Sequence, residues 1–87
     1  FCTSDIFALG VLDALRDSGL RIPEDVGVMG FDNIDTLRYV RPRLATVDQE
    51  VETISKAAID QLVALINKEN VAAQCECPYQ IVPGETA

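Results

Sequence analysis

Two strand patterns separated by one helix pattern fill residues 1–31, and this order constrains the fold more than any other feature. Residues 26–31 form a nearly continuous apolar run, which is typical of a strand covered on both faces. An amphipathic helix is expected from about residue 5 to residue 18, and residues 1–4 suit the end of an earlier strand. Together they make a βαβ unit, whose crossover is almost always right-handed. The sequence therefore predicts an α/β fold.

Both ends of this first helix carry sequence signals. Ser4 or Asp5 is expected to cap the N-terminus, because short oxygen-bearing side chains accept bonds from the free N–H groups there. Gly19 stands where a left-handed residue ends a helix, and Leu20 follows as its hydrophobic contact. The apolar arc of the helix is wide, which predicts burial on two sides.

The rest of the chain continues the alternation of helices and strands. A short helical turn is expected at residues 34–40 and a third strand at residues 44–47. The clearest helical spacing runs from residue 50 to about residue 68, and Asn70 is its expected C-cap. After a loop, residues 79–82 form a last strand candidate.

Several classes of function are disfavoured by composition. The chain has no histidine, so the commonest general base near neutral pH is missing, and no spacing singles out a catalytic pair. Cys2, Cys75 and Cys77 are odd in number and include a Cys-x-Cys pair, which argues against a zinc site and against a disulfide framework. Reduced thiols of a cytosolic protein are the better interpretation. We therefore expect no enzyme, no cofactor and no metal.

Charge and hydropathy exclude further classes of binding partner. The net charge of −7 disfavours binding to nucleic acid by this chain itself. Arg38, Arg41 and Arg43 form the one basic cluster, and a solvated turn or a partner-contact segment explains it better than a phosphate-binding patch. No stretch approaches the roughly 20 apolar residues of a membrane helix. No membrane partner is expected.

Polar side chains follow the first two predicted strands where each strand ends. Ser4 and Asp5 end the first strand, and Asp32 and Asn33 end the second. Ligands collect at the carboxyl ends of strands in an open parallel sheet, so both clusters are expected to face one cleft. The Asp32 carboxylate suits a vicinal pair of sugar hydroxyls, and Phe31 offers an apolar face for a ring. Alternatively, Asp5 only caps the helix, and Asp32 only starts the following turn.

Four blocks of the sequence, in order and at compatible spacing, resemble the lactose/galactose-repressor (LacI/GalR) family of transcription regulators. They are residues 4–11, 19–26, 28–33 and 42–49, and the likeness runs from about residue 3 to residue 69. Members of this family have an N-terminal helix-turn-helix and a two-lobed effector domain like that of periplasmic sugar-binding proteins. The resemblance implies a truncated C-terminal fragment of that effector domain, with a partial, Rossmann-like parallel sheet.

The resemblance also implies a division of the chain. Residues 1–48 would belong to the C-terminal lobe, residues 49–70 to the crossover and a helix of the other lobe, and residues 71–87 to a returning strand and tail. The implied protein is a cytoplasmic repressor whose effector is a carbohydrate or a related small polar molecule. It would bind operator DNA only through an N-terminal domain that this chain lacks, and it would form homodimers or higher oligomers.

The resemblance implies roles for particular residues. Asp32 would hold the effector hydroxyls, Ser4 would occupy an effector-contacting position that is often asparagine in relatives, and Gln49 would face the cleft from the crossover. Family dimers pair partly through the helix matched by residues 6–18, which includes Phe7 and Leu9, and through the segment around Tyr39.

An alternative is an extracytoplasmic sugar-binding protein of a transporter, which shares the two-lobed fold. Residues 22–25 and Pro42 are more similar to the repressors, and this resemblance carries the preference.

Overall fold

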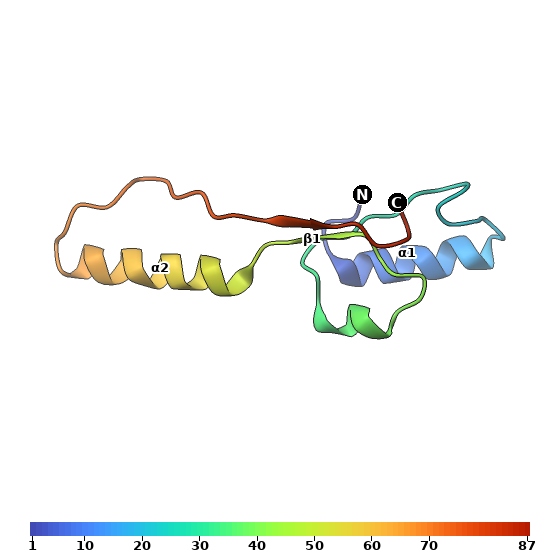
Figure 1. The fold of residues 1–87 in the computed structure, drawn as a ribbon, viewed down its shortest axis with the longest axis horizontal. Coiled ribbons are helices and arrows are strands. Elements are labelled where there is room, and N and C mark those ends of the chain that lie inside the picture. Colours follow the sequence, from blue (N-terminus) through green and yellow to red (C-terminus); the bar gives the residue numbers. More distant parts are fainter. The chain divides into compact units, whose positions relative to one another are not determined.

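The computed structural model describes all residues, 1–87, which divide into two compact units. The first unit contains residues 1–48 and 81–87, and the second contains residues 49–80. Along the chain, the elements are helix α1 (Asp5–Asp17), the 3-10 helix η1 (Asp35–Tyr39), strand β1 (Thr46–Asp48), helix α2 (Val51–Ile66) and strand β2 (Gln80–Val82) (Figure 1).

Three extended segments lie side by side in the first unit. The N–H of Cys2 donates to the carbonyl of Met29 at 2.8 Å, and the N–H of Gly30 donates to the carbonyl of Ala45 at 2.9 Å. Met29 and Ala45 form a parallel bridge. The segment before α1, the segment around Met29 and β1 are therefore neighbours in that order, and the predicted α/β arrangement is confirmed. The first two are held by isolated bonds and do not form regular strands.

The C-terminal tail closes the other side of β1. β2 pairs with β1, while the N–H of Glu85 donates to the carbonyl of Arg43 at 2.6 Å, so the two segments run in opposite directions. Thr86 is fully buried; its hydroxyl donates to the carbonyl of Val28 at 2.7 Å and accepts from the N–H of Ala45 at 2.9 Å. The tail therefore ties the start of β1 to the neighbouring segment.

Helix α1 begins and ends as its sequence predicts. Ser4 is the N-cap, and its hydroxyl accepts from the N–H of Phe7 at 3.3 Å. At the other end, Gly19 has a φ of 74°, and the N–H of Leu20 donates to the carbonyl of Leu15 at 3.0 Å. These are the left-handed residue and the long backbone bond of a Schellman motif.

The core lies between α1 and the extended segments. It consists of Ala8, Leu12, Val28, Leu37 and Leu44. On the outer face of α1, large apolar side chains such as Ile6 and Phe7 are 64% and 66% exposed. Within this chain the wide apolar arc of α1 is therefore covered on one side only.

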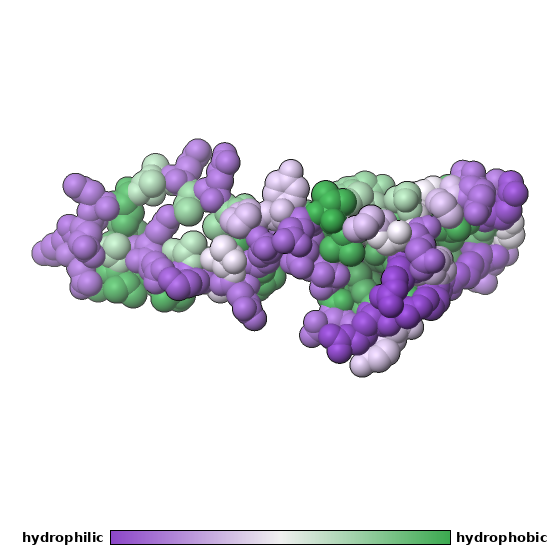
Figure 2. All heavy atoms as spheres, in the orientation of Figure 1, coloured by the Kyte–Doolittle hydropathy of each residue, from purple (hydrophilic) through white to green (hydrophobic).

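Helix α2 contains no buried residue, although its apolar spacing is as predicted. Its C-cap is Asn67, and Lys68 takes the left-handed conformation with a φ of 59°. The N–H of Glu69 donates to the carbonyl of Ala64 at 2.9 Å, which completes the same kind of C-terminal motif as in α1. The predicted cap at Asn70 is wrong, because a lysine takes the left-handed position two residues earlier. Figure 2 shows hydrophobic residues at the surface of this unit. Neither helix is long and apolar enough to cross a bilayer.

Candidate functional site

The ends of the first two extended segments meet at one edge, as the sequence predicts. The N–H of Asp5 donates to the carbonyl of Phe31 at 2.9 Å, which places Ser4 and Asp5 beside Phe31 and Asp32. The N–H of Asp32 donates to the carbonyl of Val47 at 2.9 Å, so the end of β1 joins the same edge.

Ser4 and Asp32 are both half-buried at this edge. The Ser4 hydroxyl accepts a bond from the helix, and its own hydrogen remains available to donate. Asp32 has a φ of 116° and Asn33 a φ of 57°, so the chain turns sharply at this point. Asparagine adopts a φ near 57° readily, whereas the φ of Asp32 is strained, and strained residues cluster at functional sites. The turn and the candidate contact therefore coincide at Asp32.

The side chain of Asn33 holds the turn to the end of β1. Its amide nitrogen donates to the carboxylate of Asp48 at 3.1 Å, which links the turn to the end of β1.

Phe31 is half-buried and packs edge-on against the ring of Phe1, with ring centroids 6.4 Å apart. Gln49 is the first residue of the second compact unit, so its role stays a prediction from the resemblance.

Asp5 has a different role from the one expected for it. It is the first residue of α1 rather than the cap, and it is fully buried. One carboxylate oxygen accepts from the hydroxyl of Thr46 at 2.6 Å, and the other accepts from the N–H of Ile34 at 2.9 Å. Asp5 therefore joins α1, β1 and the turn after Asp32 at one buried point. Its role is to hold these three segments together, and its carboxylate is not available to a ligand.

One signal in the sequence could have revealed this buried carboxylate. Gly30 lies inside an apolar strand pattern, where a glycine often marks the close approach of another group. A side-chain carbon at Gly30 would overlap an oxygen of the Asp5 carboxylate. The glycine therefore leaves the space that Asp5 occupies.

The residues predicted for the dimer interface differ in exposure. Phe7 is 66% exposed and Tyr39 is 79% exposed. Leu9 is half-buried and packs against the core of its own chain.

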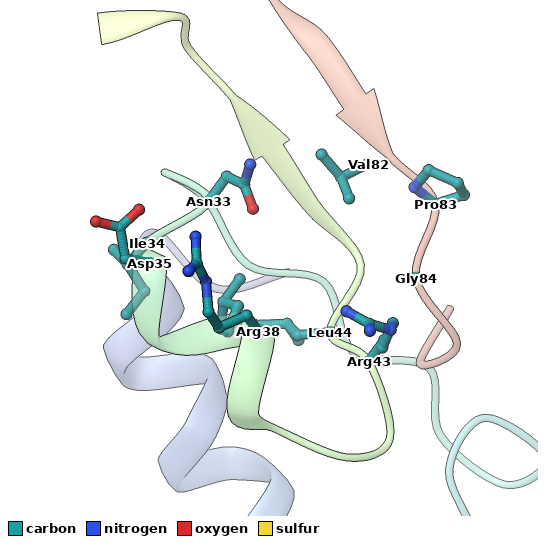
Figure 3. Close-up of a pocket in the computed structure, with 10 residues that line it drawn as sticks. Asn33, Ile34, Asp35, Arg38, Arg43, Leu44, Val82, Pro83 and Gly84 are labelled. Atoms are coloured by element: carbon teal, nitrogen blue, oxygen red, sulfur yellow. The ribbon is translucent and has the colours of Figure 1, made fainter.

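A cavity of about 330 Å³ lies in the first unit, between η1 and residues 82–84 (Figure 3). Asn33 and Ile34 line it, but none of the four predicted effector residues does. The cavity therefore adjoins the turn at Asn33, but the predicted effector residues do not line it.

The three cysteines are free thiols, and Cys77 lies near Cys75. Desolvation, together with the neighbouring Cys75, raises the pKa of the Cys77 thiol, which makes it a poorer nucleophile. No group of three or more side chains is arranged to hold a metal ion.

Comparison with known proteins gives the family of the chain. Residues 1–87 match the family of periplasmic binding protein-like domains. The probable HTH-type transcriptional repressor ExuR of Bacillus subtilis is 40% identical over 74 residues, which are 85% of this chain and 22% of that protein. The ribose operon repressor of Haemophilus influenzae is 40% identical over 70 residues, which are 80% of this chain and 21% of that protein. The chain thus spans about a fifth of the length of these relatives.

Solved structures agree with this assignment. The lac repressor dimer bound to operator and an anti-inducer superposes with a TM-score of 0.89 at 28% identity, covering 97% of this chain and 29% of that one. A LacI family transcriptional regulator from Enterococcus faecium with bound ribose gives a TM-score of 0.81 at 27% identity, covering 97% of this chain and 32% of that one. The chain belongs to the LacI family of transcription regulators, and it is part of a periplasmic binding protein-like domain.

Proposed function

We propose that this chain is part of the effector-binding domain of a transcription repressor, and that its effector is a sugar or a related small polar molecule. The meeting of Ser4 and Asp32 at one strand edge carries the proposal, since polar groups there suit a hydroxyl-rich ligand. The names of the relatives support it, because they include a ribose operon repressor and regulators solved with ribose and with lactose.

Each residue of the proposed site has a chemical role. Asp32 accepts hydrogen bonds from two neighbouring hydroxyls, one on each carboxylate oxygen. Ser4 donates its hydroxyl hydrogen, and Phe31 packs against the apolar face of the ring. Gln49 belongs to the second compact unit, and its contact with the effector rests on the resemblance alone. None of these roles requires a catalytic group, and we propose binding without chemistry.

Replacing Asp32 tests the proposal directly. In the full-length protein, Asp32→Ala is expected to weaken effector binding by about tenfold to hundredfold, because hydrogen bonds to a charged group contribute about 1.5–3 kcal/mol. Isothermal titration with ribose, lactose and other candidate sugars gives the affinities. Asp13→Ala, which removes an exposed carboxylate from α1, is the matched control and should bind as the wild type does. Equal affinities for the wild type and Asp32→Ala contradict the site.

Operator DNA and a second subunit are the proposed macromolecular partners, and the cytoplasm is the proposed location. DNA contact would come from a helix-turn-helix elsewhere in the full-length protein, because this chain carries a net charge of −7. The alternative function, sugar delivery to a transporter, predicts a secretion signal in place of the helix-turn-helix. The upstream reading frame distinguishes the two.

Two exposed residues, one on α1 and one at the end of η1, lead to a prediction about self-association. Phe7→Glu and Tyr39→Glu each place a charge on a largely exposed apolar position. If these positions pair in a dimer, each variant should weaken dimerisation by about tenfold or more, as measured by sedimentation equilibrium of the full-length protein. Ser18→Glu, also at an exposed position, is the control. A dimer of unchanged affinity in both variants removes Phe7 and Tyr39 from the interface.

A further inference from the structure

Two arginines of this chain have side chains without a partner, and both line the same cavity. Arg16 and Arg21 each pair with a carboxylate, and Arg41 donates to backbone carbonyls. The guanidinium groups of Arg38 and Arg43, in contrast, make no ion pair and no hydrogen bond. The basic cluster of the sequence is therefore divided, and two of its three members face the cavity beside η1.

The cavity has a charged rim and an apolar wall. Arg38 rises from η1 on one side, and Arg43 lies on the other side, next to the tail (Figure 3). Between them the wall is formed by Ile34, Leu44 and Val82. Its volume of about 330 Å³ is at the lower end of the range for small-molecule sites.

The acidic residue at this cavity does not neutralise the two arginines. Asp35 lines the rim but forms no ion pair with Arg38 or Arg43, and the Glu85 carboxylate accepts from the backbone N–H of Arg43 at 2.9 Å rather than from its guanidinium. The chain carries 14 acidic residues against 7 basic ones, so acidic partners are abundant and these two guanidinium groups still have none. Guanidinium groups bind carboxylates and phosphates through paired N–H donors.

We propose that this cavity binds a small anion with two acidic groups, one held by Arg38 and the other by Arg43. The positions of the arginines on opposite sides favour two separated charges over a single one. The apolar wall contacts the part of the ligand between them. This site is separate from the proposed effector site, because Asp32, Ser4 and Phe31 do not line the cavity.

Titration of the full-length protein with pyrophosphate and with citrate tests the proposal. The wild type should bind at least one of them, and the affinity should fall as sodium chloride is added. The double variant Arg38→Gln/Arg43→Gln should bind it at least about tenfold more weakly, a loss of about 1.4 kcal/mol. The control is Lys56→Gln/Lys68→Gln, which removes the same charge from the second unit and should bind as the wild type does.

The remaining outcomes decide the chemistry of the ligand or overturn the proposal. Preference for pyrophosphate assigns the site to phosphate groups, and preference for citrate assigns it to carboxylates. Equal binding of xylitol, a neutral polyol, overturns the proposal. So does an equal loss in both double variants, which would reflect net charge alone, or failure of the wild type to bind either anion.

Discussion

Replacing Asp5 by alanine should lower the free energy of unfolding by about 3 kcal/mol. Asp5 is fully buried, and its two oxygens accept from the hydroxyl of Thr46 and from the N–H of Ile34. Each buried donor left without an acceptor costs about 1–3 kcal/mol. Loss of an acidic side chain from the first turn of a helix costs about 0.3–1 kcal/mol more. Urea denaturation of the full-length protein, followed by circular dichroism, measures the change.

A matched variant separates this role from a general loss of charge. Asp13→Ala removes another acidic residue of α1, whose side chain is 78% exposed and pairs with Arg16 at 3.3 Å. Its expected cost is below about 1 kcal/mol, because exposed ion pairs contribute little. If Asp5→Ala is too unstable to fold, Thr46→Val tests the same junction, since it removes only one of the two donors. Similar costs for the Asp5 and Asp13 variants would contradict the buried junction.

The sequence predicts the local structure of this chain well because local signals determine it. The cap at Ser4 and the left-handed Gly19 lie within a few residues of the groups that they satisfy. The spacing that predicts α2 also involves residues only three and four apart along the chain.

The buried junction could not be predicted in the same way. Thr46 lies 41 residues from Asp5 and Ile34 lies 29 residues from it, so only the folded chain brings the three together. An aspartate after a serine cap reads as an ordinary helix start, and nothing local distinguishes a buried carboxylate from an exposed one.

Helix α2 shows a second limit of sequence patterns. Its periodicity predicts an apolar face, yet no residue of the helix is buried in this chain. The period of a helix fixes which side chains share a face, but it does not name the surface that covers them. The same holds for the outer face of α1, where Phe7 is exposed.

Gly30→Ala should destabilise the fold by about 3 kcal/mol, although it adds a single methyl group. The new carbon would overlap an oxygen of the Asp5 carboxylate and would lie 3.1 Å from Cδ2 of Leu44 and 3.2 Å from Cα of Asp5. The carboxylate is held by Thr46 at 2.6 Å, so it gives way only by losing that bond. Overpacking of this kind costs about 1–3 kcal/mol before the lost hydrogen bond is counted.

Gly10→Ala is the matched control, and its effect should have the opposite sign. A side-chain carbon at Gly10 meets nothing within 4 Å, and the residue lies in the middle of α1. Alanine there should stabilise the helix by about 0.5–1 kcal/mol.

Combining Gly30→Ala with Asp5→Ala tests whether the added methyl group collides with the Asp5 carboxylate. If the added methyl group acts on the carboxylate, the double variant loses less than the sum of the two single variants, because the second change removes what the first collides with. Strict additivity of the two losses would mean that Gly30 is needed for another reason, and that the glycine does not make room for Asp5.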